Sequence, residues 1–189
     1  MARPRKHSDE VMIAAAGRVI GRTGPGFTLA EVAAEAGVAT GTVMHRFGSK
    51  HGLLVAMTRA AVEGVRAAGG GHDDVVDVIV DAYADLDDPS AAANNLAQLA
   101  VDLTDPDLRD LMAEFYAALE QRLETVVAAA HLPGAPQPAL AARILAALAD
   151  GSAVHWSARP VGSLRDRLRE DVTAVVDGWR RPLSKGTRT

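Results

Sequence analysis

The side chains best suited to recognition chemistry in this chain gather in one short segment, "GVATGTVMHRFGSK", at residues 37–50. Read as a helix over residues 40–47, the segment has few apolar positions, and its outward face carries Thr40, Thr42, His45 and Arg46. That face offers hydrogen-bond donors and methyl groups, which suit contacts with the base edges and phosphates of duplex DNA. A helix this short is marginal in water, so neighbouring elements must hold it in place.

The preceding residues predict a second short helix that supports the first. Thr28 is suited to cap a helix over residues 29–36, and Glu31 three residues later completes a capping box. Gly37 then suits a left-handed C-cap. Small or β-branched side chains let the two helices approach each other and pin the second one, namely Val32, Ala33, Val38 and Val43. A helix, a glycine turn and a helix form the unit that places its second helix in the major groove of DNA.

The rest of the chain is predicted to be helical as well. Hydrophobic residues make up 48% of the 189 residues and aromatic residues 4%, and helix-forming residue types dominate. Apolar residues recur at helical spacing between breaks such as "GRTGPGF", "DDPS" and "HLPGAPQP". We therefore expect an all-α fold of about nine helices, over residues 8–22, 29–36, 40–47, 49–68, 73–86, 90–103, 104–130, 138–158 and 163–181.

Charge is distributed unevenly along the chain, whose formal net charge is −4. Residues 1–50 carry a net charge of +3, and the remainder carries −7. A basic N-terminal end on an otherwise acidic chain indicates that this end binds an anionic partner. The N-terminal arm carries Arg3, Arg5 and Lys6, and it could lie along a groove of DNA or add nonspecific attraction to DNA. We divide the chain into a helix-turn-helix domain at residues 1–52, a connecting helix at about 50–68, and a larger helical domain at 69–189.

Several classes of site have no support in the sequence. The chain has no cysteine, which excludes disulfides and thiolate zinc sites. It has no HExxH, no G-x-S-x-G and no glycine-rich phosphate loop, and its six histidines are scattered without ligand spacing. We therefore expect neither an enzyme nor a bound metal or cofactor. No apolar run approaches the length of a membrane span and the first residues lack an apolar signal segment, so a cytoplasmic protein without a membrane partner is expected.

The stretch "FTLAEVAAEAGVATGTVMHRFGSKHGLL" resembles the TetR family of transcriptional regulators. The likeness lies in a Thr-capped helix, Ala-Gly-Val, Gly-Thr, a phenylalanine, a lysine and paired leucines, and it covers about residues 8–60. Three positions depart from the family pattern, in which Ser is usual in place of Ala39, Tyr in place of Met44, and His or Tyr in place of Arg46. The departures remove two hydroxyls that would contact phosphates. Arg46 could replace one of these contacts or reach a guanine edge.

The resemblance implies a set of contacts with DNA. Thr40 and Thr42 would lie near base methyls or phosphates, and His45 either reads a base or is simply solvated. Lys50, together with the amides that open the next helix, would hold a phosphate. Thr28 could add a second backbone contact or act only as a cap. The full set of residues expected to contact DNA is Thr28, Thr40, Gly41, Thr42, His45, Arg46 and Lys50.

One helix-turn-helix reads few bases, so such proteins usually dimerise on a two-fold site. The last two predicted helices carry apolar seams that suit a four-helix interface with a second copy. Because each helix is apolar on more than one side, about half of these residues suit an intramolecular core equally well. The expected dimer interface comprises Ile144, Leu145, Leu148, Leu168, Val172, Val175, Val176 and Trp179.

The resemblance also implies a small-molecule pocket in the larger domain. Asn95 and Gln98 lie one turn apart on a helix otherwise rich in Ala and Leu, as polar groups that fix a ligand in an apolar cavity would. Aromatic and methionine positions at helical spacing suit a plain core equally well. The ligand candidates are Tyr83, Asn95, Gln98, Met112, Phe115, Tyr116, His155 and Trp156.

The sequence therefore predicts a homodimeric regulator that resembles the TetR family. It would act as a repressor that an unidentified small-molecule ligand releases from a palindromic DNA operator, with activation as a less common possibility. The alternative is a helical binding or scaffold protein whose helix-turn-helix serves only packing. An all-α enzyme is a third class, but it would need clustered acid and base groups that the sequence does not show.

Overall fold

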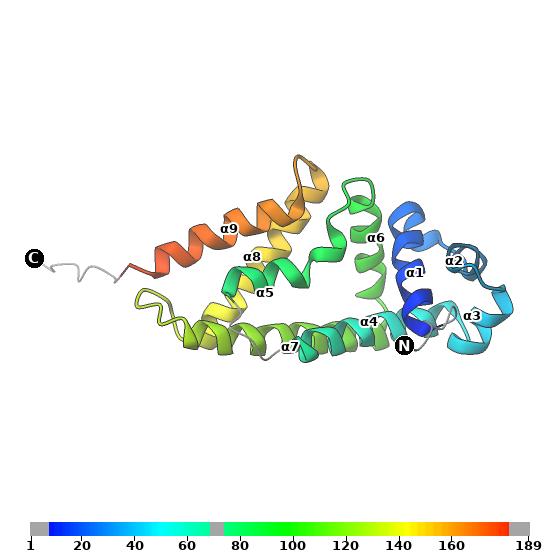
Figure 1. The fold of residues 1–189 in the computed structure, drawn as a ribbon, viewed down its shortest axis with the longest axis horizontal. Helices are drawn as coiled ribbons and strands as arrows, with labels where there is room; N and C mark the ends of the chain where they lie inside the picture. The colour runs from blue at the N-terminus through cyan, green and yellow to red at the C-terminus, as the bar shows by residue number, and fades with distance from the viewer. Residues whose placement is uncertain (1–7, 69–73, 182–189) are drawn as a thin grey trace, which may run out of the picture. The chain divides into compact units, whose positions relative to one another are not determined.

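The computed structural model describes residues 8–68 and 74–181 (Figure 1). These residues form nine α-helices and two short 3-10 turns, without a β-strand among them, so the all-α prediction is confirmed. None of the described helices is long and apolar enough to cross a lipid bilayer. The helices are α1 (Asp9–Thr23), α2 (Leu29–Ala36), α3 (Thr40–Phe47), α4 (Lys50–Ala67), α5 (Val75–Ala82), α6 (Ala92–Asp102), α7 (Pro106–Ala129), α8 (Pro138–Ala158) and α9 (Leu164–Trp179).

The predicted helix boundaries agree closely with these elements, with one exception. The helix expected over residues 73–86 ends as an α-helix at Ala82 and continues as a 3-10 turn over Ala84–Leu86. The backbone of Tyr83, between the two, has φ −109° and ψ 8°, which is outside the α-helical region. The break reorients the chain directly after Tyr83.

The chain divides into two compact units, each of which is described by itself. The first unit runs to Gly64 and also includes Asp88–Phe115, while the second contains Val65–Asp87 and the residues from Tyr116 onward. The sequence did not anticipate that residues 88–115 pack with the N-terminal helices. They do so because α6 lies against α1, where the Asn94 side-chain amide donates to the Gly21 carbonyl at 2.8 Å. Gly21 is necessary there, since a Cβ atom would lie 2.8 Å from that of Ala91.

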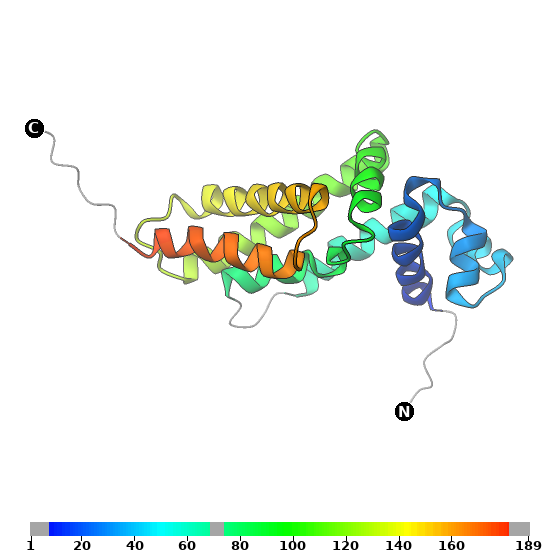
Figure 2. The same cartoon turned by 90° about the horizontal axis from the view of Figure 1, so that it is seen from above.

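The core of the first unit lies where α1, α2, α4 and the start of α7 meet. Its members include Val19, Phe27, Val32 and Leu53, all almost fully buried. Helix α1 lies beside α2, and α2 beside α3, an arrangement that both ribbon views show (Figures 1 and 2). This core gives the two short helices α2 and α3 the support that neither could provide alone.

The second unit contains α5, α8 and α9, with α9 packed on both of the others (Figure 2). Leu145 and Ala149 of α8 and Leu168 and Val172 of α9 are completely buried. Ser163 caps α9 by accepting a hydrogen bond from the Asp166 amide. The seams predicted on these helices are therefore used, at least in part, within one chain.

Candidate nucleic-acid interface

Helix α2 begins and ends as its sequence predicts. The Thr28 hydroxyl accepts from the Glu31 amide at 3.2 Å, and the Glu31 carboxylate accepts from the Thr28 amide at 2.7 Å, which confirms the capping box. Gly37 closes the helix with φ 69° and ψ 34°, the left-handed conformation that a glycine adopts without strain. The turn to α3 is thus determined by local chemistry.

Helix α3 packs against the core on one side and is exposed to solvent on the other. Val43 is completely buried against Met12 and Ala33, and Val38 and Phe47 pack around this cluster. The opposite side is exposed, and it consists of Thr40, Gly41, Met44, His45 and Arg46, with Thr42 half-buried at its edge. The structure therefore gathers five of the seven predicted DNA contacts on one helix and leaves them accessible, apart from the edge position of Thr42.

Met44 is a member of this face that the sequence reasoning did not assign to DNA contact. Its side chain is 46% exposed, which is high for a large apolar residue on a helix anchored to a core. Apolar side chains in the major groove contact the methyl group of thymine. The signal was present in the sequence as a methionine where the resembled family usually has tyrosine.

Arg46 has a partner in the free protein. Its guanidinium lies 3.2 Å from the carboxylate of Asp9, the first residue of α1. Both side chains are exposed, so the ion pair is weak and can readily open. Asp9 therefore orients Arg46 but also competes with any anion that approaches it.

Lys50 is anchored inside the first unit. Its ammonium donates to the carbonyls of Pro25 and Phe27 at 2.6 and 2.7 Å, and it lies 4.1 Å from the centre of the Phe27 ring. An ammonium has three protons, so one donor remains for a phosphate. Lys50 thus connects the start of α4 to the turn before α2, independently of any contact with DNA.

Thr28 also has an internal function. Its hydroxyl donates to the Glu31 carboxylate at 2.8 Å while accepting from the Glu31 amide, so both roles of the hydroxyl are used. These hydrogen bonds hold the pKa of Glu31 below its usual value, which keeps the carboxylate charged beside Thr28. A phosphate contact by this hydroxyl would have to displace Glu31.

Two arginines of α1 clamp α2 in place. Arg18 and Arg22 each donate to one oxygen of Glu35, both at 2.6 Å. Both hydrogen bonds, that from Arg18 first, lower the pKa of the Glu35 carboxyl. The basic N-terminal arm with Arg3, Arg5 and Lys6 lies outside the described residues.

This geometry, an anchored helix with an open polar face after a glycine turn, agrees with the comparisons with known proteins. The model of bacterial regulatory proteins of the TetR family matches residues 12–57, and the model of the C-terminal part of BetI-type transcriptional repressors matches residues 72–180. The second match alone covers more than half of the chain. The chain belongs to the TetR family. None of the curated proteins matches it closely enough to be called a relative.

Solved structures of several proteins share this fold. A transcriptional regulator from Rhodococcus is 23% identical with a TM-score of 0.66, covering 90% of this chain and 97% of its own. A TetR regulator from Legionella pneumophila is 16% identical with a TM-score of 0.69, covering 93% and 99%. The multidrug-binding protein EbrR, complexed with malachite green, is 25% identical with a TM-score of 0.58, covering 88% and 96%.

The predicted dimer residues of this TetR-family chain fall into two groups. Four of them lie in the core of the second unit and are buried by their own chain: Leu145, Leu168, Val172 and Val176. The other four are at least partly exposed. Ile144 is 39% exposed, and Leu148, Val175 and Trp179 are half-buried. The buried group is thus covered by its own chain, in which α9 packs against both α8 and α5.

The predicted ligand residues are divided between the two units. Asn95, Gln98, Met112 and Phe115 belong to the first unit, whereas the second contains Tyr83, Tyr116, His155 and Trp156. In the second unit, His155 is exposed, and the buried Trp156 donates its indole N–H to the Gly162 carbonyl at 3.3 Å. Tyr83 and Tyr116 come together on a residue that the sequence analysis did not consider, Asp150 of α8.

Gln98 is the most buried polar member of the predicted set, with 6% of its surface exposed. Its side-chain N–H donates to the Asp102 carboxylate at 2.6 Å, while its carbonyl oxygen is enclosed without a hydrogen-bond partner among the residues that the structure describes. Burial raises the pKa of Asp102. A buried acceptor left open in this way is costly.

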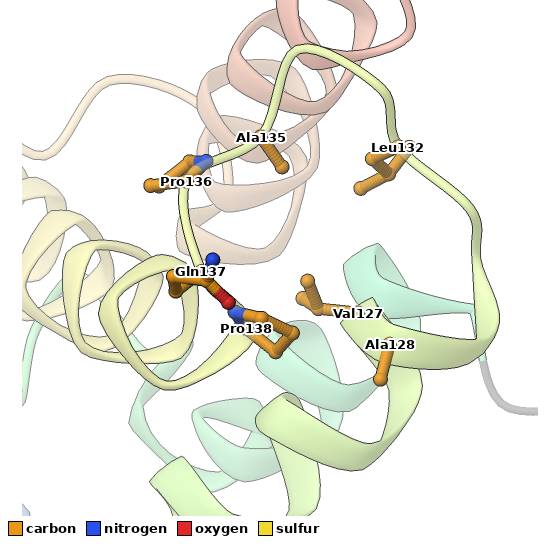
Figure 3. Close-up of a pocket in the computed structure, with 7 residues that line it drawn as sticks. All are labelled: Val127, Ala128, Leu132, Ala135, Pro136, Gln137 and Pro138. Atoms are coloured by element: carbon orange, nitrogen blue, oxygen red, sulfur yellow. The ribbon is translucent and has the colours of Figure 1, made fainter.

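Two surface concavities of the second unit lie away from these residues. The one in Figure 3 is formed by Val127 and Ala128 at the end of α7 and by the loop before α8, with Leu132 and the residues 135–138 around it. The other is lined by Asp74, Val76, Asp77, Arg169, Thr173, Val176 and Arg180. None of the eight predicted ligand residues lines either concavity.

One further group of possible metal ligands was not predicted, because its histidine and its first carboxylate are 54 residues apart in the sequence. His51 of α4 lies 3.3 Å from Asp105 and 3.6 Å from Asp107, at the start of α7. Their ligand atoms lie within 4.8 Å of one another, a spacing that could hold a cation. Asp105 already has a structural task, since it accepts from the Leu108 amide at 3.1 Å as the cap of α7, and this bond is the main reason that its pKa is lowered.

Proposed function

We propose that this TetR-family chain is a homodimeric transcriptional repressor that leaves a palindromic operator when a small molecule binds. The observation that carries the proposal is the exposed face of α3. A helix of eight residues keeps a polar side open to solvent while Val43 anchors the other side, which is an arrangement without benefit for packing alone.

The DNA contacts in this proposal follow the geometry of that face. Thr40, Thr42 and His45 would meet base edges or phosphates, and Gly41 would let the backbone approach the duplex. Arg46 would exchange Asp9 for a guanine edge or a phosphate. Lys50, with one proton free, and Thr28 would supply weaker backbone contacts.

The dimer in this proposal uses the exposed stripe of α8. Leu140 and Ile144 are 41% and 39% exposed, and Val154 two to three turns further on is 43% exposed. Ala147 and Gly151 lie between them on the same face and are also exposed. Spacings of three and four residues along a helix form one continuous stripe, which is typical of helix pairing.

The ligand response is supported by the buried polar groups of the chain and by the ligand-bound relative. EbrR is a multidrug-binding protein solved with malachite green and also with imidazole. By analogy, the C-terminal part of this chain would accept a small organic molecule. Binding would favour a conformer whose two recognition helices no longer match the half-sites.

Selection of bound duplexes from a random pool tests the proposal most directly. An enriched palindrome with half-sites about one helical turn apart is expected. The Arg46→Ala variant should then bind the selected duplex more weakly, whereas Arg165→Ala, with the same change of charge on α9, should bind like the wild type. A protein that enriches no sequence and binds no duplex at low salt would instead be a helical scaffold.

A further inference from the structure

Asp150 is the only acidic residue of α8, and it lies half-buried in the second unit. Two phenols from other elements converge on it. Tyr83, directly after α5, and Tyr116, on α7, both donate to the Oδ1 atom of Asp150, the latter at 3.4 Å. The three side chains thus connect three helical segments that are 34 and 67 residues apart in sequence.

Among the described residues, the Asp150 carboxylate has no counterion. Burial raises the pKa of Asp150, and the two phenol hydrogen bonds oppose that effect. Burial and the neighbouring carboxylate raise the pKa of Tyr116 to about 12, so this phenol stays protonated and can only donate. Within the part of the chain that the structure describes, no Lys, Arg or His forms a hydrogen bond or ion pair with Asp150. A carboxylate in such a place is costly unless a positive charge reaches it.

One oxygen of this carboxylate is open. Both phenols use Oδ1, so Oδ2 has no donor among the described residues. It is also absent from the polar atoms that are fully enclosed without a partner, which means that it keeps some access. The arrangement leaves a charged acceptor beside two aromatic rings, one of them only half-buried.

We propose that Asp150, together with Tyr83 and Tyr116, recognises an organic cation as the ligand of the second unit. This inference rests on the proposed ligand-responsive function and names the class of the ligand. A cation would supply the positive charge that no described residue brings to Oδ2, and the rings of Tyr83 and Tyr116 would add a favourable interaction with it. A neutral ligand of the same shape would leave the carboxylate uncompensated.

A pair of aromatic probes tests the proposal. N-methylquinolinium carries a permanent charge, and lepidine has nearly the same shape but is uncharged at mildly alkaline pH. Calorimetric titration of the full chain should show binding of the cation at least about tenfold tighter than that of lepidine. Tetraethylammonium, a cation of different shape, extends the test to a second size.

The Asp150→Asn variant is the decisive one, because the amide oxygen still accepts both phenol hydrogen bonds while the charge is gone. It should bind both cations at least about tenfold more weakly than the wild type and should bind lepidine unchanged. Asp81→Asn, with the same change of charge on the exposed side of α5, is the matched control and should keep the wild-type affinity. Tyr116→Phe should weaken cation binding to a smaller extent.

Three results would overturn the proposal: cations that bind no better than lepidine, cations that do not bind at all, or equal cation affinity in Asp150→Asn and the wild type. DNA binding by the same samples separates this failure from that of the proposed function. If all variants bind the selected duplex but Asp150→Asn responds to cations as the wild type does, only the ligand class is wrong. If the wild type binds no duplex, the regulator proposal itself fails.

Discussion

At the scale of single residues, the pairing of Arg46 with Asp9 has the most direct consequence for DNA binding. The Asp9 carboxylate lies 3.2 Å from a guanidinium nitrogen of Arg46, and both side chains are exposed. We expect Asp9→Asn to bind the operator more tightly, by up to about fivefold, because it frees Arg46 and removes a negative charge. Fluorescence anisotropy with a labelled duplex measures this change.

Glu10→Gln is the control for that experiment. It removes the same charge from the neighbouring residue of α1, which is exposed and, among the described ion pairs, forms none with Arg46. If Glu10→Gln strengthens binding as much as Asp9→Asn, the gain comes from overall charge alone and the specific competition at Arg46 is refuted.

Asp150 also predicts a change of stability with pH. Burial raises its pKa in the folded protein, so the folded state holds this proton at a pH where the unfolded chain has already lost it. The free energy of unfolding of the wild type should therefore fall relative to Asp150→Asn as the pH rises through the folded-state pKa of Asp150. Urea unfolding of both proteins across the acidic to neutral range gives this difference. A difference that stays constant with pH would show that Asp150 has an ordinary carboxyl pKa.

At the scale of elements, the capping box carries the stability of α2. Thr28→Ala removes the hydroxyl that accepts from the Glu31 amide, and this should lower the free energy of unfolding by about 1 kcal/mol. Denaturant unfolding measures the loss, and Thr28→Ser, which keeps the hydroxyl, should be close to the wild type. If Thr28→Ala is as stable as the wild type but weakens DNA binding, the residue serves as a phosphate contact and not as a cap.

At the scale of the whole molecule, the exposed stripe of α8 predicts the oligomeric state. Ile144→Asp places a charge in the centre of that stripe and should convert the proposed dimer to a monomer. A large loss of affinity for the proposed operator should follow, because the two half-sites would no longer be bound together. Light scattering coupled to size-exclusion chromatography measures the mass.

Val101→Asp provides the control at this scale, since Val101 of α6 is 46% exposed but belongs to the first unit. This variant should remain dimeric. Should Ile144→Asp also stay dimeric at micromolar concentrations, the interface lies elsewhere on the chain.

The helix-turn-helix could be derived from the sequence because every signal for it is local. A Thr cap with its Glu, a glycine in the left-handed region, and valines at helical spacing act over three or four residues, which is the range of helical hydrogen bonds and of side-chain contacts along one helix. The boundaries of α2 and α3 and the outward direction of Thr40 and His45 therefore follow without knowledge of the rest.

Only the tertiary structure shows which side chains of α8 and α9 are buried and which residues are the partners of Arg46, Lys50 and Asp150, because both depend on which helix faces pack together. Helices α8 and α9 are apolar on several sides, and only their packing shows that Leu145 is buried while Ile144 is exposed. The partners of Arg46 and Lys50 lie 37 and 23 to 25 residues away, and those of Asp150 lie 34 and 67 residues away. Contacts between residues so far apart in sequence depend on how the helices pack in three dimensions. The helical repeat of 3.6 residues predicts only which side chains share a face of one helix, so it cannot predict these contacts.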